Sequence, residues 1–246
     1  MVVGVPANGN NMVRAALSLS QALGREVLVT QVSDTSYTVV SDGSLRPKPG
    51  DQGMEFRSPP MPVEEMLSDF KKVVDWAKSV GAYTGKEYKT GLHMNLSVPG
   101  LNKEKLDYVK LALLVGDKYV LEKFKRLMVG SGETNYARSS LGAIVDVVKS
   151  KPALAKTALD KMRENMSLAA SRAIYEGNTD KYSSINVSDK LSTYNKKTNR
   201  VEFRGPGGDY INDYANEPGK IIDTLRRFAV ALEAASDPEK ITSSLS

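Results

Sequence analysis

The stretch GLHMNLS, residues 91–97, contains the only histidine of the 246-residue chain. Apolar residues stand at positions 92, 94 and 96, and His93, Asn95 and Ser97 alternate with them. Successive side chains of a β-strand point to opposite faces of the sheet, so this alternation predicts a strand with one apolar and one polar face. The polar face is then either a functional site or ordinary solvent-exposed surface.

Composition places the chain among globular proteins, because 41% of its residues are hydrophobic and 26% are charged. The 34 basic residues are interleaved with 29 acidic ones, so the net charge of +5 permits an anionic partner but does not favour nucleic acid. With no cysteine, disulfides, zinc–thiolate sites and thiol nucleophiles are excluded. Any metal must be held by oxygen ligands and at most one imidazole, which favours Mg²⁺ or Mn²⁺.

No targeting or membrane segment is visible in the sequence. No apolar run approaches the roughly 20 residues that cross a bilayer, and the N-terminus lacks the basic-then-apolar order of a signal peptide. We therefore expect a soluble cytoplasmic protein without a membrane partner. The sequence does not predict the oligomeric state.

Periodicity along the chain predicts strands first, then helices, then strands and a final helix. The predicted strands cover residues 2–5, 26–32, 36–44, 53–57, 91–97, 182–188 and 199–205. The predicted helices cover residues 10–23, 62–80, 103–115, 117–129, 139–150, 152–175 and 217–235. This order predicts an α+β fold with a largely antiparallel sheet, in one domain over residues 1–236 with a polar tail at 237–246.

Four predicted strands carry polar side chains two residues apart, which places both members of each pair on one sheet face. The pairs are Glu55 with Arg57, His93 with Asn95, Ser184 with Asn186, and Glu202 with Arg204. Neighbouring strands would collect carboxylates, amides, guanidinium groups and the imidazole on one surface, which could hold Mg²⁺ and the phosphates of ATP. The alternative is that each Glu-x-Arg is a solvated ion pair and that the histidine is a hydrogen-bonded structural residue.

Five segments, taken in order, resemble the putative amidoligase family of the glutamine synthetase and glutamate-cysteine ligase superfamily. The segments are TVVSDGSL (38–45), GMEFRSPP (53–60), GAYTGKEYKTGLHMNLSV (81–98), KYSSINVS (181–188) and NRVEFRGPGGDYIN (199–212). They match the family's Asp-Gly-Ser, Glu-x-x-Ser-Pro, Gly-x-His-x-His, Tyr with a downstream Asn, and closing Glu-Phe-Arg. The resemblance covers roughly residues 1 to 235.

The resemblance implies a curved, largely antiparallel sheet like the glutamine synthetase catalytic domain, with the site on its concave face and helices packed on its outer face. It also implies an ATP-dependent carboxylate-amine ligase. ATP would phosphorylate a carboxylate, and an amine would displace phosphate from the acyl phosphate to leave an amide. The substrates would be a carboxylate and an amine, each a small molecule or a peptide.

The resemblance also assigns roles to individual residues. It implies that Glu55, His93 and Glu202 bind Mg²⁺ or Mn²⁺ and that Arg204, acting with Glu202 in catalysis, neutralises charge on the transferred phosphoryl group. The residues expected to contact ATP are Arg57, Arg204, Asn95 and Asn186, and those expected to contact substrate are Asp42, Ser44 and Tyr182.

The chain departs from the family pattern at two places. The first strand of the family carries Gly-x-Glu-x-Glu, whereas VGVPANG (3–9) has Pro6 and Asn8 at the glutamate positions. The second histidine of Gly-x-His-x-His is Asn95, whose amide oxygen can still bind a hard cation or a substrate. Either the missing carboxylates come from elsewhere, such as Asp34, or the sequence is a piece of a larger protein, or the domain has lost catalysis and kept its fold. The last case gives the alternative function, a catalytically degenerate amidoligase fold that serves as a binding or structural module.

Overall fold

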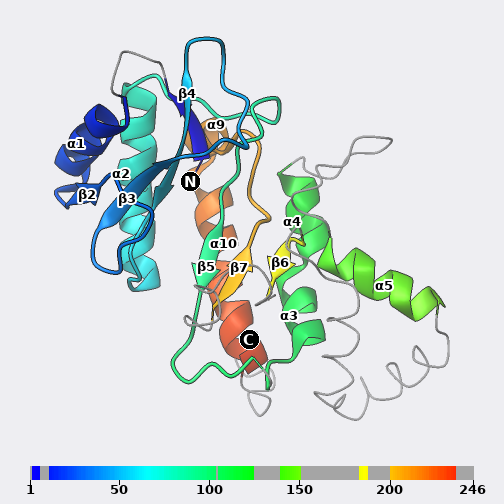
Figure 1. The fold of residues 1–246 in the computed structure, drawn as a ribbon. Helices are drawn as coiled ribbons and strands as arrows, with labels where there is room; N and C mark the ends of the chain where they lie inside the picture. Colours follow the sequence, from blue (N-terminus) through cyan, green and yellow to red (C-terminus); the bar gives the residue numbers. More distant parts are fainter. Residues whose placement is uncertain are drawn as a thin grey trace. The chain divides into compact units, whose positions relative to one another are not determined.

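A computed structural model describes residues 2–5, 11–103, 105–124, 139–150, 183–187 and 200–236 of the chain (Figure 1). These residues belong to two compact units, the first formed by residues 1–92 with 206–223 and the second by residues 93–205 with 224–246. The predicted helix at 152–175, the end of the predicted helix at 117–129 and the predicted tail at 237–246 lie outside the described residues.

The first unit contains a four-stranded sheet in the order β1-β4-β3-β2. Its strands are β1 (Val2–Val5), β2 (Val27–Leu28), β3 (Tyr37–Ser41) and β4 (Gln52–Arg57). Strand β4 pairs antiparallel with both β1 and β3, whereas β2 pairs parallel with β3. The antiparallel pairing follows the prediction, but β2 covers two residues of the stretch predicted as a strand over 26–32.

Helices α1 (Asn11–Leu23) and α2 (Val63–Ser79) pack together beside this sheet, as Figure 1 shows. Trp76 of α2 joins the layers, because its ring meets Phe56 of β4 edge-on at 5.0 Å between centroids and its Nε1–H donates to the Ser18 hydroxyl of α1 at 2.9 Å. Phe70 of α2 makes a similar edge-on contact with Tyr214 at 5.5 Å. Aromatic side chains therefore fix how these helices and strands pack.

Two helices follow the last strand of the chain. They are α9 (Tyr210–Asn216) in the first unit and α10 (Pro218–Ser236), whose residues from Thr224 onward belong to the second unit. The sequence predicted α10 but not α9. No helix of the described residues is long and apolar enough to span a membrane.

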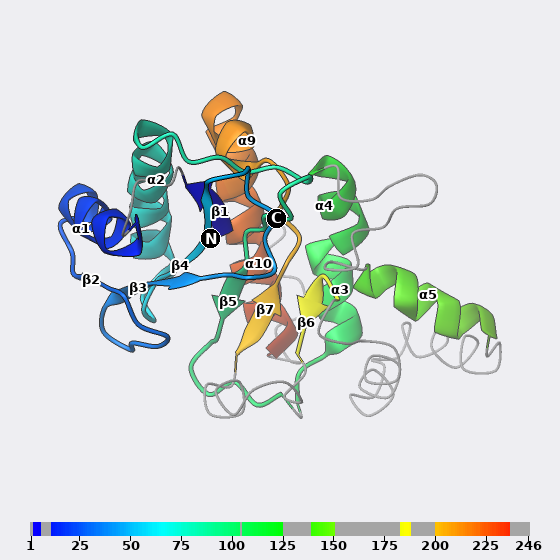
Figure 2. The ribbon, with the colours of Figure 1, turned by 45° about the horizontal axis from the view of Figure 1, so that its top comes forward.

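The second unit contains a three-stranded antiparallel sheet in the order β5-β7-β6. Its strands are β5 (Met94–Leu96), β6 (Ile185–Asn186) and β7 (Val201–Phe203), and Figure 2 shows β7 between the other two. Its further helices are α3 (Tyr108–Val115), α4 (Asp117–Lys123) and α5 (Ser140–Ser150). The Phe203 ring of β7 stacks on Phe228 of α10 with centroids 4.6 Å apart, so the apolar face of this sheet packs on a helix.

The alternation read from the sequence is confirmed on three strand segments. Met54 and Phe56, Leu92 and Met94, and Val201 and Phe203 are all buried. The α+β class is confirmed too, but the described strands form two small sheets, so a single curved sheet of the glutamine synthetase kind is not seen among them. One domain over residues 1–236 stays a prediction.

Candidate functional site

The register of the second sheet places three polar residues in one cross-strand row. Glu202 of the central strand β7 lies opposite Asn95 of β5 on one side and Asn186 of β6 on the other. Residues directly opposite each other in a sheet project to the same face. The same register, continued by one residue beyond the strands, brings His93 opposite Arg204.

Hydrogen-bond geometry joins four of these side chains, which we call the polar cluster: Asn186, Glu202, His93 and Arg204. The His93 Nδ1 lies 3.3 Å from Glu202 Oε1, and Arg204 Nε donates to His93 Nε2 at 3.4 Å. Asn186 Nδ2 donates to the other carboxylate oxygen, Glu202 Oε2, at 3.0 Å. The side chains of His93 and Glu202 are 24% and 19% exposed, so solvent and small solutes can reach them.

A backbone hydrogen bond fixes the position of Arg204 at the end of β7. The N–H of Arg204 donates to the carbonyl of Ser184 at 2.7 Å, which ties the end of β7 to the segment that leads into β6. The Ser184 side chain is buried and its hydroxyl lies 3.3 Å from that of Ser140 in α5. The Ser184 hydroxyl therefore bonds to the first turn of a helix, and its place on one sheet face with Asn186 stays a prediction.

The pKa values of the cluster follow from burial and from its charges. Burial lowers the pKa of His93 below 6.5, and the Arg204 guanidinium acts in the same direction, although the hydrogen bond to Glu202 opposes both. Burial by itself would raise the pKa of Glu202, but the bond from His93, the charges of His93 and Arg204, and the bond from Asn186 outweigh it and lower this pKa to about 2. At neutral pH the cluster therefore contains a carboxylate, a neutral imidazole and a guanidinium.

Glu55 and Arg57 lie on β4 of the first unit and form an ion pair, with Arg57 Nη2 2.5 Å from Glu55 Oε2. Arg57 Nη1 also donates to the carbonyl of Gln31 at 2.9 Å. This is the geometry of the ion-pair alternative, and the Arg57 side chain is 41% exposed. Because the polar cluster belongs to the second unit, the shared metal site of Glu55, His93 and Glu202 stays a prediction.

The residues expected on the substrate side form a local turn in the first unit. Asp42 Oδ1 accepts hydrogen bonds from the backbone N–H of Ser44 at 2.8 Å and from its hydroxyl at 2.6 Å. An aspartate side chain that accepts a hydrogen bond from the backbone N–H two residues later is common in tight turns. A substrate-binding role for both residues stays a prediction, and Tyr182, Pro6 and Asn8 lie outside the described residues.

The donors near Glu202 determine which metal ion the polar cluster could hold. Within the described ranges, no group of three or more His, Asp or Glu side chains is placed to hold a metal ion. Glu202 offers carboxylate oxygens, and the exposed Asn95 lies beside it on β5. Oxygen donors of this kind suit Mg²⁺.

One buried charge was missed in the sequence. Asp69 of α2 is buried, and its carboxylate accepts from Tyr37 at 3.0 Å while Arg25 Nε and Lys72 Nζ lie 2.7 and 3.2 Å from it. Its burial could have been predicted from its position next to Phe70, on the face of the helix that otherwise carries apolar residues. The cations around Asp69 indicate a structural role.

A comparison with protein families matches residues 9–215 to the family described as "putative amidoligase enzyme". The matched range contains the polar cluster as well as Asp42, Ser44, Glu55 and Arg57. Searches of curated proteins and of solved structures gave no significant match.

Proposed function

Because the chain belongs to the amidoligase enzyme family, we propose that it joins a carboxylate to an amine in a reaction driven by ATP. The observation that carries the proposal is the family match over residues 9–215, which spans every residue of the polar cluster. The γ-phosphoryl group of ATP would pass to the substrate carboxylate and form an acyl phosphate and ADP. The amine would then attack the acyl carbon, with loss of phosphate and of one proton, to leave an amide.

Arg204 is the residue that we assign to the transferred phosphoryl group. Its guanidinium can form the forked hydrogen bonds that phosphate oxygens accept. Its backbone is held by Ser184 and its Nε by His93, so the cation is positioned before substrate arrives. A fixed cation of this kind stabilises the charge that develops in phosphoryl transfer without reorganisation at the moment of reaction.

The remaining proposed contacts follow the family pattern. Glu202 would hold Mg²⁺ through its carboxylate oxygens, a role that the family pattern also gives to Glu55, and the ion would shield the charge of the ATP phosphates. We propose that Arg57, Asn95 and Asn186 contact ATP. The substrate contacts would come from Asp42, Ser44 and Tyr182.

The test measures ATP turnover against a panel of amino acids, dipeptides and polyamines supplied as carboxylate and amine. We expect ADP and an amide product, detected by mass spectrometry, only when a suitable pair is present. Arg204→Lys keeps the positive charge but loses the two parallel N–H donors of the guanidinium. Turnover should therefore fall by about 10- to 1000-fold, while the melting temperature stays close to that of the wild type.

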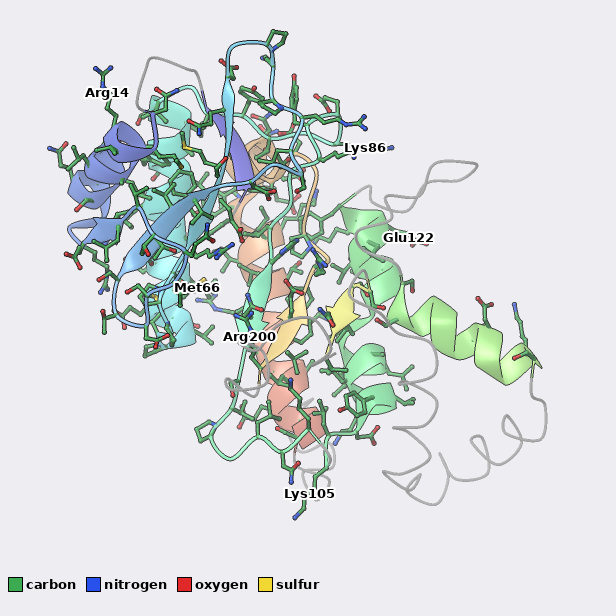
Figure 3. All side chains as sticks on the ribbon, viewed as in Figure 1. Arg14, Met66, Lys86, Lys105, Glu122 and Arg200 are labelled. Atoms are coloured by element: carbon green, nitrogen blue, oxygen red, sulfur yellow. The ribbon has the colours of Figure 1, made fainter. Side chains whose placement is uncertain are left out.

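The matched control is Arg14→Lys on α1, where the side chain is exposed and points away from the packed helices (Figure 3). This change should leave turnover unaltered. Equal turnover in wild type and Arg204→Lys would remove Arg204 from the chemistry. No ADP with any pair would count against the ligase itself.

A second candidate function is a catalytically degenerate member of the family that binds a ligand or partner without turning it over. The observation in its favour is the replacement of the two first-strand glutamates of the family by Pro6 and Asn8. A neutral amide and a proline cannot supply two anionic metal ligands. Nucleotide binding without ADP formation would favour this candidate over the ligase.

A further inference from the structure

Both ring nitrogens of His93 contact protein groups. Arg204 Nε lies 3.4 Å from His93 Nε2, and a guanidinium N–H can only donate, so Nε2 must be the accepting nitrogen. The ring proton is then on Nδ1, which faces Glu202 Oε1 at 3.3 Å. The two neighbours thus select one tautomer of the imidazole.

This tautomer conflicts with the metal-ligand role that the family pattern gives to His93. An imidazole binds a metal through a nitrogen lone pair, and the lone pair of this ring points at the Arg204 guanidinium. A cation bound there would take the place of an arginine hydrogen bond and would meet a positive charge at close range. The contacts therefore do not fit imidazole ligation.

The same contacts fit a different role. Asn186 donates to Glu202, Glu202 accepts from His93, and His93 accepts from Arg204, so one chain of hydrogen bonds runs from β6 across β7 to the guanidinium. Each link fixes the next, and the rigid planar ring spans the gap between a carboxylate and a cation. A free arginine side chain samples many rotamers, so an arginine that is already held in place loses less entropy when it binds an anion.

We propose that His93 is a positioning residue that orients Arg204 toward the phosphoryl group, held in turn by Glu202, and that it is not a metal ligand. The identity of the anion rests on the proposed function. The positioning itself does not, because it concerns contacts within this chain. Partners of this outer kind typically change activity by about 10- to 100-fold when they are removed.

The first experiment uses the fact that His93 is the only histidine of the chain. Protein labelled with ¹⁵N-histidine gives one pair of ring nitrogen signals, whose shifts identify the protonated nitrogen. At about pH 7.5 we expect the Nδ1–H form, and we expect millimolar Mg²⁺, which the proposed function places at Glu202, to leave the Nε2 lone pair uncoordinated. A proton on Nε2, or the large change of the Nε2 signal that direct coordination of Mg²⁺ produces, would overturn the proposal.

Variants sharpen this measurement. Arg204→Lys removes the Nε donor and should shift the Nε2 signal, and Glu202→Gln should weaken the preference for the Nδ1–H form. Arg14→Lys on α1 is the matched control and should leave both signals unchanged. An Nε2 signal that is identical in wild type and Arg204→Lys would show that the arginine contact does not exist in solution.

The second experiment separates positioning from ligation by steady-state kinetics. The leucine of His93→Leu can neither bind a metal ion nor bridge Glu202 and Arg204. We therefore expect kcat to fall about 10- to 100-fold, while the Mg²⁺ concentration for half-maximal rate stays the same. His93→Gln keeps one donor and one acceptor and should recover most of kcat. A raised Mg²⁺ requirement in His93→Leu would contradict the proposal. A wild-type protein without turnover would refute the ligase, and the nitrogen signals would still decide the role of His93.

Discussion

Glu202 stays charged in the fold because its neighbours outweigh its burial, and this makes stability depend on acid. Its pKa is about 2 in the folded chain against 4.5 ordinarily, so its contribution is complete above about pH 4.5 and is lost as pH falls toward 2. That difference corresponds to roughly 3 kcal/mol. We predict that the advantage of wild type over Glu202→Gln in unfolding free energy shrinks by about 2 to 3 kcal/mol across this window.

Urea unfolding of both proteins at a series of pH values checks this prediction. The difference between the two curves isolates Glu202, since every other carboxyl group titrates in both proteins. An advantage that is the same at about pH 3 as at neutral pH would show that the carboxylate makes none of these contacts in solution.

Asp69 is the buried charge on which the packing of α2 against β3 depends. Asp69→Ala would leave the buried hydroxyl of Tyr37 without its carboxylate acceptor and Arg25 without its buried carboxylate partner. We predict a loss of about 3 to 5 kcal/mol for Asp69→Ala and about 1 kcal/mol for Tyr37→Phe. The control is Glu65→Ala, because Glu65 also pairs with Arg25 but is 42% exposed and should cost less than about 1 kcal/mol. Equal losses at positions 65 and 69, measured by urea unfolding, would contradict this ranking.

Individual residues also show where sequence reasoning succeeded. The buried alternation around Glu55, His93 and Glu202 was predicted because a two-residue period is a local signal. The burial of Ser184 was not predicted, because its partner Ser140 lies 44 residues away and no residue pattern within the strand indicates this contact. The tautomer of His93 likewise depends on Arg204, which is remote in sequence but adjacent in the sheet.

At the scale of elements, two glycines should respond in opposite ways to alanine. Gly116 ends α3 in the left-handed region at φ 60°, where a side chain is strained and the added Cβ would lie 3.2 Å from Arg227. Gly219 lies in the first turn of α10, and its nearest neighbour would be Asp223 at 3.6 Å. We predict that Gly116→Ala destabilises by about 1 kcal/mol or more and that Gly219→Ala stabilises by a few tenths to about 1 kcal/mol.

Thermal unfolding of the two variants beside wild type measures both effects, and each serves as the control for the other. A melting temperature that rises in Gly116→Ala would mean that the break between α3 and α4 does not need the left-handed residue. The helices would then run on as one.

Helices were predicted better than strands. The predicted bounds of α1 and α2 agree with the structure because local signals are strong there: both helices have a long apolar stripe, Gly24 follows α1, and Glu64 and Glu65 lie in the first turn of α2. Helix α9 was missed because the preceding GPGG (205–208) indicates a turn and the seven helical residues are too few to show a period. Strand β2 was predicted too long, since β-branched residues favour a strand whether or not a partner is available.

For the whole molecule, the proposed function predicts a response to nucleotide. A ligand that binds only the folded chain stabilises it by about 2.7 kcal/mol at 100 times its Kd. In a chain of this size that corresponds to a rise of roughly 5 to 10 °C in Tm. We predict such a rise with Mg²⁺ and a non-hydrolysable ATP analogue, and a smaller one for Arg204→Lys.

Differential scanning fluorimetry measures the shift, with Mg²⁺ alone and the analogue alone as controls. If millimolar analogue and Mg²⁺ leave Tm unchanged in wild type, neither the ligase nor a nucleotide-binding module of this family describes the protein.

The antiparallel pairing of β5 with β7 joins Met94 to Phe203, more than a hundred residues further along the chain. A ribosome that adds roughly 5 to 20 residues per second would deliver the second strand about 5 to 20 s after the first. During that interval His93 has neither Glu202 nor Arg204, and the apolar side of β5 has no strand partner from β7. The polar cluster can therefore form only late in synthesis. Until then the apolar side chains of β5 lack their partner strand, so β5 is a candidate segment for chaperone binding.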